Sequence, residues 1–150
     1  MPKQSTGLPN PKLNLPTNLI RKFKQKALRS RHEVLAFLIG SITKENDVIT
    51  SITVEELYYP PQEAGKAYVS WNPNDVVRLQ AKILPRHIVG TIHSHPGYEP
   101  HISRDDIATS EHFGDVISGI YSWWRNSNST KRLTDLTFYY GAKILDVNDV

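Results

Sequence analysis

The sequence predicts a single α/β (α+β) domain in which a mixed β-sheet is sandwiched by helices. Segments with strand-like apolar runs alternate along the chain with two or three amphipathic segments of helical spacing. The 150 residues suffice for one sizeable core, and 39% hydrophobic with 22% charged residues is ordinary globular composition. Cysteine is absent, so no disulfide can hold the fold together.

The N-terminal elements are predicted from prolines and apolar spacing. Residues 1–16 contain four prolines and little periodicity, which predicts a flexible tail before a domain spanning 17–150. Thr17 or Asn18 can cap a helix that runs to about Arg29. Its apolar stripe comprises Leu19, Ile20, Phe23, Ala27 and Leu28.

This first helix is also strongly basic. A solvated helix face is the favoured interpretation, and contact with nucleic acid or an acidic protein is the alternative. The cations are Arg21, Lys22, Lys24, Lys26, Arg29 and Arg31.

The remaining elements follow from turn residues and capping signals. Asn72 can cap a second helix, with Pro73 at its first position and its end near Leu84. A third helix is expected over 103–113. The expected strands are 34–42, 48–59, 68–71, 87–93, 116–122, 133–140 and 143–147, with a loop at 60–66.

A metal site is outlined by His93 and His95. Side chains at i and i+2 of a strand point to the same side, so both imidazoles can reach one ion. Asp106 can supply a third ligand if the chain turns back and a helix starts near Ser103. Two imidazoles and one carboxylate suit zinc and leave a position open for water, which indicates hydrolysis. Alternatively, Ser103 is a simple helix cap and the histidines form a polar strand face.

The spacing His-x-His, seven residues, Ser, two residues, Asp resembles the signature of the JAMM metalloproteases, the catalytic branch of the MPN domain proteins. His-Ser-His-Pro-Gly is similar to the version in deubiquitinating members. That family also uses a glutamate about sixty residues upstream, before a hydrophobic strand ending in glycine, and Glu33 has that position. The resemblance covers roughly residues 18–145 and implies a three-layer, cytidine-deaminase-like architecture.

The resemblance also implies roles for the motif residues. His93, His95 and Asp106 would hold one zinc ion per chain, Glu33 would be the general base, and Ser103 would donate a hydrogen bond to the oxyanion. The implied activity is that of a zinc isopeptidase, which cleaves the amide bond after the C-terminal tail of a ubiquitin-like or sulfur-carrier protein. The short chain resembles the compact prokaryotic or archaeal members.

Two alternatives stay open: a non-catalytic MPN scaffold subunit, and a nucleic-acid-associated protein like the RadC relatives. Nucleic acid is disfavoured because Phe23 alone supplies an aromatic ring within the basic cluster. A homodimer or an accessory subunit is compatible with the sequence. Without a long apolar run or a signal-like N-terminus, we expect no membrane contact and a cytoplasmic protein.

Overall fold

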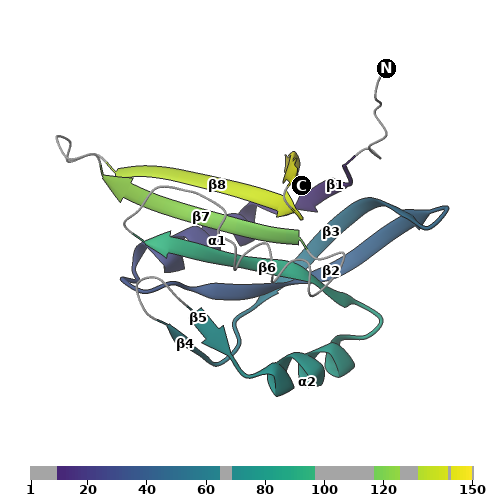
Figure 1. Ribbon diagram of the computed structural model, residues 1–150, viewed down its shortest axis with the longest axis horizontal. Helices are drawn as coiled ribbons and strands as arrows, with labels where there is room; N and C mark the ends of the chain where they lie inside the picture. Colours follow the sequence, from purple (N-terminus) through teal and green to yellow (C-terminus); the bar gives the residue numbers. More distant parts are fainter. Residues whose placement is uncertain (1–9, 65–68, 97–116, 126–131, 142, 150) are drawn as a thin grey trace.

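The computed structural model describes residues 10–64, 69–96, 117–125, 132–141 and 143–149 (Figure 1). This part of the chain is mostly β-structure, with ten strands and two helices. The elements are β1 (Lys12–Leu15), α1 (Thr17–Leu28), β2 (Leu35–Glu45), β3 (Val48–Tyr58), β4 (Gln62–Ala64), β5 (Val69–Trp71), α2 (Pro73–Ile83), β6 (His87–Pro96), β7 (Ile117–Arg125), β8 (Arg132–Tyr140), β9 (Lys143–Leu145) and β10 (Val147–Asp149).

Eight of these strands form one mixed sheet in the order β10-β1-β3-β2-β6-β7-β8-β9, and β4 pairs separately with β5. The two edge strands, β9 and β10, are separated in sequence by Asp146 alone, so the chain passes directly from one edge of the sheet to the other. Asn10, just before β1, also donates a side-chain hydrogen bond to the carbonyl of Ile144 in β9. The sheet is therefore curled into a nearly closed barrel (Figure 1).

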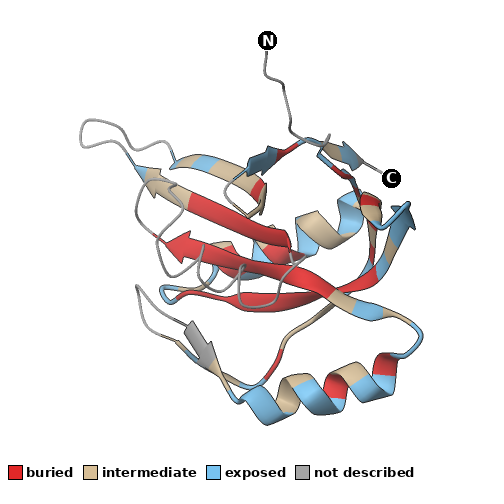
Figure 2. Cartoon of the chain, turned by 45° about the vertical axis from the view of Figure 1, so that its right-hand side comes forward, coloured by how far each residue is buried: buried red, intermediate tan, exposed pale blue. Residues whose placement is uncertain are grey.

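The two faces of β2 pack against different helices. Ala36 and Leu38 belong to the larger core cluster, which includes Phe23 and Ala27 of α1. Leu35, Phe37 and Ile39 pack with Leu79 and Ile83 of α2. Strand alternation assigns successive side chains to the two clusters. Central strands β6 and β7 are buried along most of their length (Figure 2).

The expected architecture of a sheet sandwiched by helices is wrong. The structure is a mostly-β, barrel-like sheet with two helices among the described residues. Lys12–Leu15, assigned to the flexible tail, form a strand between β10 and β3 in which Leu13 and Leu15 are buried. Pairing of Leu13 with Val147 joins the two ends of the chain, and local periodicity carries no signal for such a contact.

Several local predictions are confirmed, with differences in detail. Helix α1 has the expected range, but Pro16 precedes it and no side chain caps it. Helix α2 is capped as expected, since the Asn72 side chain accepts a hydrogen bond from the Asn74 N–H at 2.9 Å. The expected loop at 60–66 contains β4, and the expected strand at 143–147 is interrupted at Asp146. The expected helix at 103–113 lies outside the described residues.

Candidate metal site

The site is built on the C-terminal half of β6, which lies in the middle of the sheet. His93 pairs with Leu35 of β2 on one side and with Ile120 of β7 on the other. Because side chains alternate, His93 and His95 share the face of the sheet that carries Leu35 and α2, and Ser94 points to the opposite face. Both imidazoles therefore project from a strand whose backbone is held on two sides.

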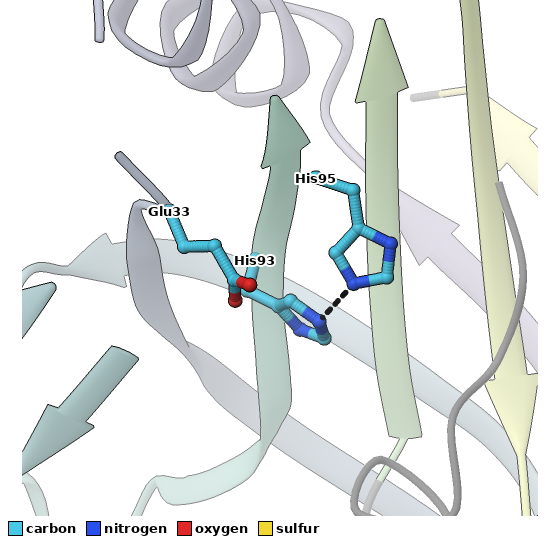
Figure 3. Close-up of side chains that lie close together, drawn as sticks. All are labelled: Glu33, His93 and His95. Atoms are coloured by element: carbon cyan, nitrogen blue, oxygen red, sulfur yellow. Dashed lines mark hydrogen bonds between the residues drawn. The ribbon is translucent and has the colours of Figure 1, made fainter. Parts of the chain in front are cut away.

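The two imidazoles converge. Their Nε2 atoms lie 3.0 Å apart, and the rings are tilted by 56° with centroids 4.8 Å apart. Glu33, two residues before β2, completes the cluster, and Figure 3 shows its carboxylate directed toward the His93 ring. One ligand atom from each of Glu33, His93 and His95 lies within 4.8 Å of the others, and the three residues are only 4–7% exposed.

This donor set fits a divalent metal ion. The two imidazoles are ligands for zinc and similar ions, and the Glu33 carboxylate adds a negative charge beside them. Burying the three groups together is costly without a compensating charge. Two nitrogen ligands of one tetrahedral zinc, at about 2.0–2.1 Å from the ion, lie roughly 3.3 Å apart. The observed separation of 3.0 Å is close to that spacing, so a small opening of the pair accommodates an ion.

The backbone that carries Glu33 is held by Ser94. The Val34 N–H donates to Ser94 Oγ at 2.9 Å, and the Ser94 N–H donates to the Val34 carbonyl at 2.9 Å. Ser94 is fully buried. The residue between the two histidines thus fixes the position of the residue that follows Glu33, which ties the carboxylate to the imidazole pair.

Gln62 of β4 supports the same segment from the other side. Its Oε1 accepts from the Leu35 N–H at 2.9 Å, and its Nε2 donates to the carbonyls of Leu35 at 3.0 Å and Pro60 at 2.9 Å. Backbone pairing of β2 with β3 stops at Phe37 and Tyr58, so the amide of Gln62 takes the place of a neighbouring strand at Leu35.

The structure thus brings together three of the five residues that the sequence singled out: Glu33, His93 and His95. Ser103 and Asp106 lie outside the described residues, and their roles remain predictions. Sequence reasoning missed Ser94 and Gln62. A serine on the core side of a buried strand signals a need for a hydrogen-bond partner, whereas nothing in the sequence pairs Gln62 with Leu35.

A buried Glu/His/His cluster on a β-barrel-like domain defines a protein with a candidate metal centre. The chain belongs to the prokaryotic homologs of the JAB domain, a family whose model matches residues 16–134. This finding confirms the resemblance to JAMM/MPN domains. No curated protein matches the chain. No helix in the described part of the chain is long and apolar enough to cross a membrane.

Proposed function

We propose that this protein is a zinc-dependent isopeptidase or peptidase that hydrolyses the amide bond after the C-terminal tail of a ubiquitin-like or sulfur-carrier protein. The observation that carries the proposal is the convergence of Glu33, His93 and His95 in a buried cluster. Membership of the JAB family supports metal-dependent peptidase chemistry at this cluster. The scaffold alternative is disfavoured, because a scaffold needs no such convergence of ligand atoms.

Each residue of the site has a separate role in the proposed hydrolysis. His93 and His95, with Asp106, would hold the ion. Zinc, when bound, supplies Lewis-acid chemistry that polarises the scissile carbonyl and makes water nucleophilic near neutral pH. Glu33 accepts the proton of the attacking water and passes it to the leaving amine. Ser103 donates a hydrogen bond to the oxygen of the tetrahedral intermediate.

An apolar groove on the same face of the sheet fits a protein substrate. It has a volume of about 580 Å³ and lies between α2 and β6. Val77 of α2 and Leu84, which follows the helix, line it and are 68% and 61% exposed. Thr91, which also lines it, is two residues before His93. Exposed apolar surface of this kind is typical of interaction sites. We assign the groove to the extended C-terminal tail of the substrate protein, which would lie along it to reach the metal.

The test combines metal content with turnover. Wild-type protein should contain about one zinc per chain, and His93→Ala should lose it. Glu33→Gln should keep the zinc and lose turnover of a ubiquitin-like fusion protein by a factor of about 10² or more, because the amide accepts no proton from water. Full zinc content in His93→Ala would refute the ligand assignment, and retained turnover in Glu33→Gln would reassign the base.

A further inference from the structure

The exposed face of α1 and the short segment that follows the helix form a one-sided positive surface. Between Thr17 and His32 the chain has six cations and no carboxylate. Residues three or four apart share a helix face, and the cations of α1 follow that spacing. Five of the six are exposed, and we call this set the basic face: Arg21, Lys22, Lys26, Arg29 and Arg31.

No carboxylate of the described chain neutralises the basic face. The ion pairs in this part of the protein join Arg78 to Asp75 and Arg86 to Glu56, and neither includes a cation of α1. Lys22 and Lys26 are four residues apart on the helix, and the repulsion between their like charges slightly destabilises it. A cluster of unpaired cations on one helix face favours an anionic partner.

Two lysines of this helix contact aromatic rings. Lys26 Nζ lies 4.7 Å from the centroid of the Tyr59 ring, and Lys24 Nζ lies 5.7 Å from that of Tyr121. Desolvation by burial raises the pKa of both phenols, and each ring contacts its lysine as a cation–π partner. These contacts order the cations and leave them available to a partner.

The basic face leads to the metal site. Arg29 caps the C-terminal end of α1, exposed Arg31 and His32 follow, and Glu33 comes next in the chain. From Arg21 to Arg29 the helix extends about 12 Å, and the last cations are within four residues of the buried carboxylate. Helix α1 covers the face of the sheet opposite to the imidazoles, so an anionic surface docked along it would approach the cluster at the Arg29 end, where the chain continues to Glu33.

We propose that the basic face docks an acidic surface of the protein substrate and steers it to the metal site, an inference that rests on the proposed hydrolysis of a protein. Nucleic acid is disfavoured because the aromatic rings of this region are unavailable for base stacking. Phe23 is fully buried, and Tyr59 and Tyr121 lie beneath lysines. Complementary charge across such an interface raises the association rate and selects the partner.

The experiment measures binding separately from turnover. Fluorescence anisotropy would follow a labelled peptide of about ten glutamates, a probe of the acidic surface alone, on full-length protein with and without zinc. The variant is Lys22→Glu/Arg29→Glu. The control, Lys44→Glu/Lys82→Glu, makes the same change in net charge at exposed positions near the end of β2 and on α2.

We expect affinity for the peptide to fall about tenfold or more in the variant and less than about threefold in the control, and to weaken as salt rises from about 0.05 M to about 0.3 M. Circular dichroism checks that both fold, and Lys22→Gln/Arg29→Gln should show an intermediate loss. Equal losses in variant and control would overturn the proposal.

An oligothymidylate of about ten nucleotides tests nucleic acid as the alternative partner. If it binds more than about tenfold tighter than the peptide, and if the same variant loses this binding, the basic face is reassigned to nucleic acid. Failure of the proposed hydrolysis is distinguishable from failure of docking. Absence of turnover on every substrate would leave the peptide titration unchanged. Normal turnover with no effect of the variant on binding or on kcat/KM would refute docking alone.

Discussion

Replacing Gln62 with alanine tests whether the segment behind Glu33 is held by a side chain. The substitution removes three hydrogen bonds of 2.9–3.0 Å and leaves the N–H and carbonyl of Leu35, which is 3% exposed, without those partners. At about 0.5–1.5 kcal/mol net for each bond, we expect unfolding free energy to fall by about 2–3 kcal/mol. Urea unfolding of the metal-free protein measures this loss.

The same variant should weaken the metal site. Leu35 pairs with His93 across the sheet, and Glu33 lies two residues before Leu35 in the chain. A displaced Leu35 therefore disturbs both His93 and Glu33. Loss of a group that positions ligands reduces metal affinity or activity by about 10–100-fold. Competition with a chromogenic chelator measures zinc affinity, and turnover at saturating zinc measures the placement of Glu33.

Gln80 provides a matched control. Its side chain also bridges backbone groups, accepting from the Ile88 N–H at 3.2 Å and donating to the Arg86 carbonyl at 3.3 Å, but at the opposite end of β6. Gln80→Ala should lose about 1–2 kcal/mol of stability with zinc affinity unchanged within about twofold. If both variants weaken zinc binding and turnover equally, Gln62 acts on stability alone and the reasoning fails.

Three further changes probe the surroundings of the site. Ser94→Ala leaves the Val34 N–H without its acceptor and should cost about 1–3 kcal/mol in urea unfolding; an unchanged midpoint would show that another group accepts this hydrogen bond. Gly90→Ala places a Cβ 2.1 Å from the Ile117 carbonyl oxygen, so a loss of about 3 kcal/mol or more is expected, and wild-type stability would contradict that close approach. Burial raises the pKa of Tyr59, so the folded state favours the neutral phenol. The stability that this phenol contributes is fully present below the pKa of about 10 in the unfolded chain and is lost as the pH rises through the folded-state pKa. Tyr59→Phe should flatten this alkaline decline, measured as the urea midpoint against pH.

The sequence predicted the elements that carry local signals. Asn72 and Pro73 mark the start of α2 by capping chemistry, and Phe23 with Ala27 mark the buried side of α1. The closure of the sheet into a barrel was not predicted, because β1 has only four residues between prolines and β10 has three. Strands of this length are too short to show a recognisable alternation of apolar and polar residues. Their pairing joins residues more than a hundred positions apart, which only the folded sheet reveals.

The cluster of Glu33, His93 and His95 was predictable to a different degree for each residue. His93 and His95 follow from the strand period alone, because any strand places them on one side. Glu33 followed only from the resemblance, and its closeness to the imidazoles depends on the pairing of β2 with β6. The supports that fix it, Ser94 and Gln62, act through backbone atoms, which the side-chain pattern of a sequence does not specify.

Strand alternation also separates the candidate metal site from the basic face. His93 and His95 project to the α2 side of β6, whereas Ile92 packs in the core beneath α1. Helix α1 is therefore joined to the metal cluster through the sheet and through the short segment from Arg29 to Glu33. Exposed cations of α1 such as Lys22 can be substituted without moving an atom of Glu33, His93 or His95. Charge variants of the basic face should consequently bind zinc with wild-type affinity, so any loss of substrate capture in them reports on docking and not on the metal.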